Sequence, residues 1–323
     1  MAGLARYSWG ILLYNLGVIA WGAFVRATGS GAGCGSHWPL CNGQVVPRAA
    51  ELATVIEFSH RITSGLALVS VIVLFFWTRR VAPAGHPTRS AAAASLAFMI
   101  SEALLGAGLV LFELVAGNTS LLRAGMAAAH LLNTFALVAS MTLMAWWASG
   151  GLPVDWRAHR KTAGQVALNA ALIMLVSAAG AITALGDTLF PSASVREGIG
   201  ADLSSASHIF VRLRTIHPVL AVVSALWVMS AAWRMAHEAR DPRAGSFAKA
   251  LLALVTVQLA AGVANIFLLA PVWLQMIHLL LADTIWILFI LLSAAVMAVR
   301  PAAVPAHTVV PFTPRHASAA GSH

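Results

Sequence analysis

The sequence is poor in charged residues and in cysteine. Only 10% of its 323 residues are Asp, Glu, Lys or Arg, whereas 59% are hydrophobic. No ordinary soluble domain has this composition, so that class of protein is excluded. The only cysteines are Cys34 and Cys41. One such pair does not by itself define a metal site.

Long apolar runs dominate the chain. A membrane-spanning helix needs roughly 20 apolar residues, and the sequence contains eight candidates, at about 7–25, 54–78, 92–113, 121–147, 163–186, 210–233, 247–270 and 273–299. The first run continues into a Gly-rich motif, so we expect it to be a retained span and not a cleaved signal peptide. The sequence predicts an all-α membrane protein with eight transmembrane helices.

The formal net charge of +9 does not indicate nucleic-acid binding, because no basic domain with a nucleic-acid motif is present. If the N-terminus is cytoplasmic, 13 of the 20 Lys and Arg residues lie on the inner side. These are Arg6, Arg79, Arg80, Arg89, Arg157, Arg160, Lys161, Arg234, Arg240, Arg243, Lys249, Arg300 and Arg315. This bias follows the positive-inside rule and predicts that both termini are cytoplasmic.

Both cysteines fall in the first outer loop, at about residues 26–53. An outer loop faces an oxidising compartment, where a disulfide persists. We therefore favour a Cys34–Cys41 disulfide over two free thiols.

The chain divides near residue 155 into halves that resemble each other. We predict two pseudo-symmetric four-helix bundles at 1–155 and 156–300, followed by a disordered cytoplasmic tail at 301–323. Aligning the halves places Gly29 on Gly186, His60 on His217, Glu102 on Gln258, Gly106 on Gly262 and His130 on His278. Such repeats usually place sites at equivalent positions.

Four histidines, His60, His130, His217 and His278, are predicted at matched depth in the even-numbered spans. Ionisable side chains inside a membrane mark functional sites by default, and imidazole is the commonest ligand for metals and heme iron. We predict that His60 pairs with His130, and His217 with His278, as axial ligands of two hemes. The alternative is a set of core histidines satisfied by hydrogen bonds.

The two halves differ beside the first histidine of each pair. Glu57 shares a helical face with His60, and the alignment places Arg214 at the equivalent position. A carboxylate there can exchange protons, whereas an arginine can bind a heme propionate. Glu57 could instead be an acid in the first helical turn, stabilised by the helix dipole. Arg214 could be an interfacial arginine that extends to the membrane surface.

Other polar residues occur within the predicted spans. They can bond between helices or to a cofactor edge, and we favour interhelical hydrogen bonds. The residues are Glu102, Asn133, Gln258, Asn265 and Asp283.

The segment VRATGSG at 25–31 is followed by Cys34, by WPLC at 38–41 and by EFSHR at 57–61. With His130, His217 and His278, this pattern resembles the heme A synthase family over about residues 7–299. The resemblance implies an eight-helix enzyme of the bacterial inner membrane. Such an enzyme oxidises the C8 methyl group of heme O to a formyl group, which gives heme A for cytochrome oxidase.

The resemblance also implies roles for the candidate residues. His60 and His130 would hold the substrate heme, with Glu57 as a catalytic residue, while His217 and His278 would hold a permanent heme b. The cysteine pair is similar to a family disulfide near the substrate site. Expected partners are heme O, a heme O synthase, cytochrome oxidase assembly factors and membrane lipid, with no nucleic acid.

Two departures from the family pattern stand out. Many members have a second cysteine pair in the third outer loop, here at about 187–209, and this chain lacks it. His37 stands before the Trp-Pro, where members often have Asp.

Two other functions use the same histidines. A di-heme b-type electron carrier or quinol oxidoreductase would hold two permanent hemes, and a transporter would use the histidines to relay protons. Two hemes at one depth argue against a carrier that moves electrons across the bilayer. The transporter leaves the Cys loop and Glu57 without a role.

Overall fold

A computed structural model describes residues 1–48, 51–239 and 241–299. The expected tail at 301–323 lies outside the described residues, as do Arg240, Arg300 and Arg315 of the predicted inner charges. The described parts are nearly all helical and contain no strand longer than an isolated bridge. The predicted all-α class is therefore confirmed.

Eight helices are long and apolar enough to cross a membrane, as the sequence predicts. Such helices satisfy their backbone hydrogen bonds internally, which is what a lipid environment requires. They are α1 (Ala2–Ala27), α2 (Leu52–Val81), α3 (Pro87–Leu111), α4 (Leu121–Ala148), α5 (Arg160–Leu189), α7 with α8 (Ile209–Leu213 and Ile216–Glu238), α9 (Arg243–Phe267) and α10 (Val272–Val296).

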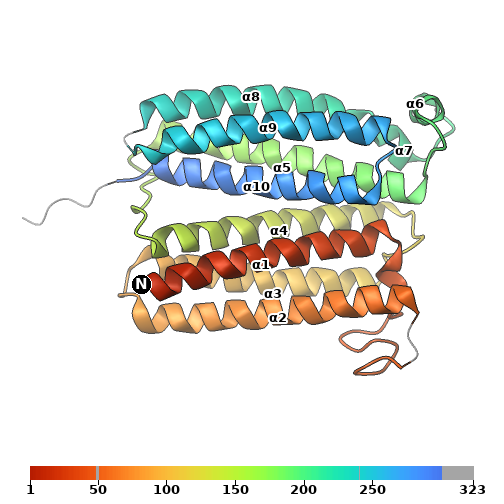
Figure 1. Cartoon of the computed structure of the whole chain (residues 1–323), viewed down its shortest axis with the longest axis horizontal. Helices are drawn as coiled ribbons and strands as arrows, with labels where there is room; N and C mark the ends of the chain where they lie inside the picture. Colours follow the sequence, from red (N-terminus) through yellow and green to blue (C-terminus); the bar gives the residue numbers. More distant parts are fainter. Residues whose placement is uncertain (49–50, 240, 300–323) are drawn as a thin grey trace, which may run out of the picture.

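The helices form two groups that lie side by side (Figure 1). In the first half, α2 and α4 each pack against both α1 and α3. In the second half, α8 and α10 each pack against both α5 and α9. The division into two pseudo-symmetric four-helix bundles stays a prediction.

The halves meet through α1 and α4 on one side and α5 and α10 on the other. In this interface the buried ring of Trp286 stacks on Phe135, and its Nε1 donates to the Phe135 carbonyl at 2.7 Å. Near the end of α1, Arg26 donates to the Ala184 carbonyl on α5 at 2.8 Å and to Gln275 Oε1 on α10 at 3.1 Å. These bonds fix one half against the other.

The third outer loop, at about 187–209, contains a helix that the sequence interpretation missed. It is α6 (Val195–Leu203), at the loop end of the molecule. Its start is a reciprocal cap, in which Ser194 Oγ accepts from the Glu197 amide and Glu197 Oε2 accepts from the Ala193 amide. The pattern Ser-x-x-Glu at 194–197 was the available signal.

The predicted span at 210–233 is interrupted at its start. Helix α7 ends at Leu213 and α8 begins at Ile216, so Arg214 caps one helix instead of continuing it. Proline has no N–H, so Pro218 cannot donate to the carbonyl of residue 214, and the regular helix cannot extend back through that point.

The turns after α3 and α9 have the same backbone form. Glu113 and Leu269 both adopt positive φ, at 53° and 58°, directly after the helix caps Phe112 and Leu268. Non-glycine residues rarely adopt this conformation. The internal alignment places these two turns at equivalent positions, so the halves share at least this local geometry.

Candidate functional site

The four histidines lie near the loop ends of alternate helices. His60 is on α2, His130 on α4, His217 at the start of α8 and His278 on α10. All four are partly exposed. Since α2 and α4 are each flanked by α1 and α3, their histidines come from opposite corners of the first half.

Each histidine faces a glycine on a flanking helix. A Cβ at Gly22 would lie 2.9 Å from His60 Cε1, and one at Gly180 would lie 2.9 Å from His217 Cε1. Real Cβ atoms do not approach other atoms so closely. Any residue larger than glycine at position 22 or 180 would therefore displace the imidazole ring.

The second histidine of each pair has the same arrangement with more room. A Cβ at Gly106 would lie 3.8 Å from His130 Cε1, and one at Gly262 would lie 3.4 Å from His278 Cε1. In both halves, therefore, two histidines each face a glycine on a flanking helix.

The pairing of His60 with His130, and of His217 with His278, stays a prediction. The Nδ1 atoms of His60, His130 and His278 are buried without a hydrogen-bond partner among the described residues. These orphaned imidazoles fit an axial-ligand role better than that of hydrogen-bonded core histidines.

The donor set also fits a heme. Within the parts of the chain that the structure describes, no three His, Cys, Asp or Glu side chains gather to hold a bare metal ion. Heme iron needs only axial ligands from the protein, because the porphyrin supplies the rest. Two imidazole pairs match that requirement.

Glu57 is buried and ties the cysteine loop to α2. Its Oε1 accepts from Arg61 Nη2 and, at 3.1 Å, from Arg61 Nε, while its Oε2 accepts from the Cys34 amide at 2.9 Å. Arg61 also donates to the carbonyls of His37 and Leu40 at 2.6 Å. The carboxylate is thus held one helical turn from His60 by the loop above it.

One alternative for Glu57 was based on a wrong helix start. Helix α2 begins at Leu52 with Glu51 as its N-cap residue, so Glu57 is not in the first turn. The dipole effect falls off within that turn and does not explain this acid. Its partners are instead Arg61 and the loop.

The disulfide prediction is confirmed, since Cys34 and Cys41 are bonded to each other. Both residues are fully buried, and the Asn42 amide donates to the Cys34 carbonyl at 2.9 Å. The closed ring therefore holds the Cys34 amide in position for Glu57. No local pattern in the sequence predicts this backbone contact.

Arg214, the counterpart of Glu57, pairs with two carboxylates. Its Nη1 lies 3.0 Å from Asp187 Oδ1 on α5, and its Nε lies 3.0 Å from Asp202 Oδ1 on α6. Burial raises the pKa of the Asp202 carboxyl above its ordinary value, and Arg214 opposes that rise. Arg214 therefore links α6 to α5. To bind a heme propionate as well, its guanidinium group would have to contact three carboxylates at once.

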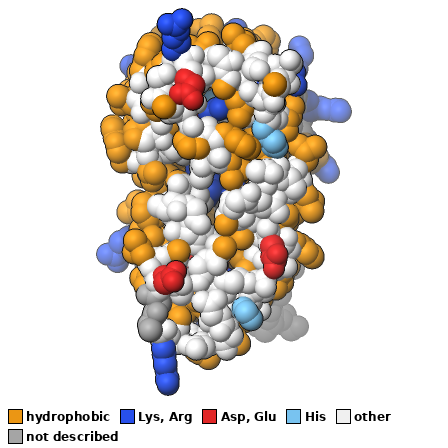
Figure 2. All heavy atoms as spheres, turned by 90° about the vertical axis from the view of Figure 1, so that its right-hand side faces the viewer, with side chains coloured by type: hydrophobic (Ala, Val, Ile, Leu, Met, Phe, Trp, Pro, Cys, Tyr) orange, Lys and Arg blue, Asp and Glu red, His pale blue; other side chains and the backbone are white. Residues whose placement is uncertain are grey.

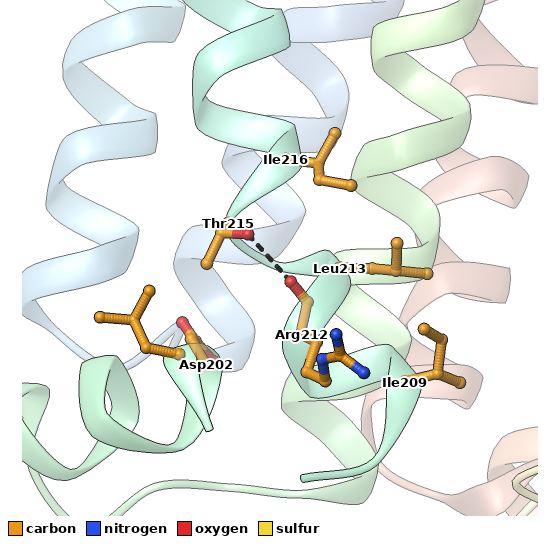
Figure 3. A pocket seen from close by; sticks show the side chains of 7 residues that line it. Asp202, Ile209, Arg212, Leu213, Thr215 and Ile216 are labelled. Atoms are coloured by element: carbon orange, nitrogen blue, oxygen red, sulfur yellow. Dashed lines mark hydrogen bonds between the residues drawn. The ribbon is translucent and has the colours of Figure 1, made fainter. Parts of the chain in front are cut away.

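The loop end of the molecule carries mixed polar and apolar surface with scattered charges, and apolar side chains gather along its rim (Figure 2). A recess of about 330 Å³ lies where α6 meets the α7–α8 junction, lined by residues that include Asp202, Arg212 and Ile216 (Figure 3). None of the four histidines lines it, so it is not the candidate heme site.

The other intramembrane polar residues differ in their contacts. Glu102 and Asn133 bond between α3 and α4, as predicted, with Asn133 Nδ2 2.6 Å from Glu102 Oε2. Gln258 contacts His278, and Asn265 donates to a carbonyl of its own helix. Asp283 is fully buried, and neither carboxylate oxygen has a hydrogen-bond partner among the described residues.

Residues 5–290 match the protein family described as "Cytochrome oxidase assembly protein" (COX15-CtaA). The chain belongs to this family. With its eight apolar helices, this family member is a multi-pass membrane protein.

Proteins named heme A synthase are among its relatives. The one from Halalkalibacterium halodurans is 45% identical over 95 residues, which is 29% of this chain and 32% of that protein. The one from Shouchella clausii is 46% identical over 105 residues, which is 32% of this chain and 34% of that protein. The resemblance inferred from the motifs is confirmed.

A longer relative carries another name. A Thermus thermophilus protein named protoheme IX farnesyltransferase is 48% identical over 294 residues. The match covers 91% of this family member but only 48% of the relative. The chain thus spans about half the length of that protein.

Proposed function

We propose that this protein is a heme A synthase, an oxidoreductase that converts the C8 methyl group of heme O to a formyl group. Membership of the cytochrome oxidase assembly protein family supports the proposal, as do the partial matches to heme A synthases. The observation that carries it is the pair of matched histidine sites, of which only the first has a buried glutamate one turn away.

The first half is the proposed reaction site. His60 and His130 hold the substrate heme, and Glu57 lies near it. Converting a methyl group to a formyl group adds an oxygen atom and removes hydrogen. With water as the oxygen source, the electrons pass to an acceptor outside this chain and protons are released, so the site needs a proton acceptor. Glu57 is the candidate, because it is the carboxylate nearest to His60 in sequence and is held in place by Arg61 and the Cys34 amide.

The second half is the proposed electron site. His217 and His278 hold a heme b, which supplies one-electron redox chemistry when bound. Arg214 keeps α6 against the end of α5 through Asp187 and Asp202. We propose that Arg214 also faces a propionate of this heme.

The setting follows from the same proposal. The protein lies in a bacterial inner membrane with both termini in the cytoplasm, and it acts with a heme O synthase and assembly factors of cytochrome oxidase. Farnesyl transfer is not proposed here, because this chain covers only half of the relative that bears that name.

Heme analysis tests the proposal. Membranes of a host that makes heme O but no heme A are prepared with and without the chain, and extracted hemes are identified by mass. Heme A, or a hydroxylated heme O, in the presence of the chain supports the enzyme. Heme b alone in both sites supports the di-heme carrier, and purified protein without heme supports the transporter.

A further inference from the structure

Glu102 lies on α3 beside the second histidine of the first half. Its Oε1 is 3.6 Å from His130 Nδ1 and accepts a hydrogen bond from Thr134 Oγ1, while its Oε2 accepts one from Asn133 Nδ2 at 2.6 Å. Gly106, one turn further along α3, faces the same imidazole. The carboxylate is thus held by two donors at the edge of the His130 ring.

Gln258 has the equivalent place in the second half. It lies on α9 one turn before Gly262, which faces His278, and its Nε2 is 3.3 Å from His278 Nε2. Its Oε1 is buried without a hydrogen-bond partner, as is His278 Nδ1. The same position therefore carries a carboxylate beside one histidine and a neutral amide beside the other.

This difference matters for a histidine that binds iron. The ring nitrogen that does not bind the metal donates its N–H to an acceptor, which fixes the tautomer and the orientation of the ring. A carboxylate acceptor also makes the imidazole a more basic ligand than an amide does. His130 Nδ1 has no hydrogen-bond partner among the described residues, and at 3.6 Å the Glu102 oxygen is just beyond hydrogen-bond range.

We propose that Glu102 is a positioning residue that accepts the Nδ1–H of His130, so that Nε2 binds iron and the first half offers a more electron-rich ligand than the second. The inference depends on the proposed function, because it assigns heme iron to His130. Gln258 offers His278 no carboxylate, since its amide nitrogen lies 3.3 Å from His278 Nε2 and His278 Nδ1 has no partner among the described residues. The two halves therefore hold iron at different reduction potentials.

A purely structural role for Glu102 makes a different prediction. The contacts with Asn133 and Thr134 also join α3 to α4, so their loss would lower thermal stability in either case. It would not change the potential of a heme that still binds. The reduction potential and the affinity of the bound heme separate the two roles.

The test uses the purified full chain in detergent, titrated with hemin and then studied by spectroelectrochemistry. A His278→Ala background isolates the first site, and a His130→Ala background isolates the second. Glu102→Gln is compared with Glu113→Gln, the same substitution at an exposed residue of the same half. Glu102→Asp tests rescue by a carboxylate.

We expect Glu102→Gln to weaken hemin binding at the first site about 10–100-fold and to shift its potential to a more positive value. Glu102→Asp should restore part of both, and Glu113→Gln should change neither. Gln258→Glu should shift the second site to a more negative value, and this reverse change does not depend on how well the Glu102 variants fold.

Two results would overturn the inference. If hemin binding requires His130 but Glu102→Gln keeps the wild-type affinity and potential, Glu102 only joins helices, and the proposed function is untouched. If hemin binding does not depend on His130 at all, the inference fails together with the proposed ligand pair.

Discussion

The two halves of this protein share a frame of histidine and glycine but differ in the charged groups set around it. In the first half, Glu57 and Glu102 lie near the histidines. In the second half, the aligned positions hold Arg214 and Gln258. We therefore propose that both halves bind the same kind of group and that only the first is equipped for proton chemistry.

The outer loops of the two halves also differ in the contacts that hold them in place. The first is closed by a disulfide and donates a backbone N–H to Glu57, which links the loop to the acid. The loop above the second half lacks cysteine and is held by ion pairs from Arg214 to Asp187 and Asp202. The aligned residues Glu57 and Arg214 thus each hold the loop of their own half, although one is negatively and the other positively charged.

The largest expected effect comes from removing a ligand in the second half. His217→Ala or His278→Ala should abolish binding of the permanent heme b, because a methyl group cannot ligate iron. The absorption spectrum of the purified variant measures this loss. Variants that keep a full heme b spectrum and unchanged redox behaviour would refute the assignment.

The next effect should occur only in the first half. Glu57→Gln keeps the shape of the side chain but cannot exchange a proton near neutral pH, so the rate of formyl production should fall on the order of 10²–10⁴-fold. The second-half heme b should stay bound, and heme O or its hydroxylated form should accumulate.

Glu51→Gln is the control for that substitution. Glu51 is the exposed N-cap residue of the same helix, and its side chain makes no capping hydrogen bond. Heme A formation at the wild-type rate in Glu57→Gln would show that Glu57 serves only to anchor the loop, and the functional contrast between the halves would be lost.

A smaller effect should follow from opening the disulfide. Cys34→Ser with Cys41→Ser frees the loop that positions Glu57, and misplacing a catalytic group by about 1 Å can cost up to about 10²-fold in rate. We expect a loss below that of Glu57→Gln, with the second-half spectrum unchanged. An equal loss of heme b would contradict the separation of the two loops.

The smallest effects should come from filling the space beside the histidines. Gly22→Ala should displace His60 and weaken substrate binding, whereas Gly180→Ala should displace His217 and lower heme b content. Overpacking of about 1–3 kcal/mol corresponds to an effect on the order of 10-fold.

Matched controls exist for both glycines. Gly17 on α1 and Gly164 on α5 have open space where a Cβ would lie, so alanine should be tolerated there. If Gly22→Ala and Gly17→Ala behave alike in a heme titration, the close approach of Gly22 to His60 has no role in the site.

Much of this arrangement could be predicted from sequence. Apolar runs give the eight spans because length and hydropathy alone decide whether a helix can cross a membrane. The internal repeat predicts how the histidines pair, and the position of Cys34 and Cys41 in one loop favours the disulfide that the structure contains. The identity of the residues at the aligned positions of Glu57 and Glu102 is also visible without a structure.

The remaining features depend on tertiary contacts. The path of the loop brings the Cys34 amide to Glu57, and no local pattern encodes that meeting. The same holds for Arg214, whose partners come from two other helices. Helix α6 could have been found from Ser194 and Glu197, but the glycines within it favoured a loop.

The most direct test of the division between the halves is the heme content of His60→Ala beside the wild-type chain. Both are produced where heme O is made, and the hemes retained by each purified protein are identified and counted by mass. We predict heme b with heme A or its precursors in the wild type, and undiminished heme b alone in His60→Ala. If the wild type holds only heme b and His60→Ala loses half of it, both halves are permanent heme sites and the proposed synthase is wrong.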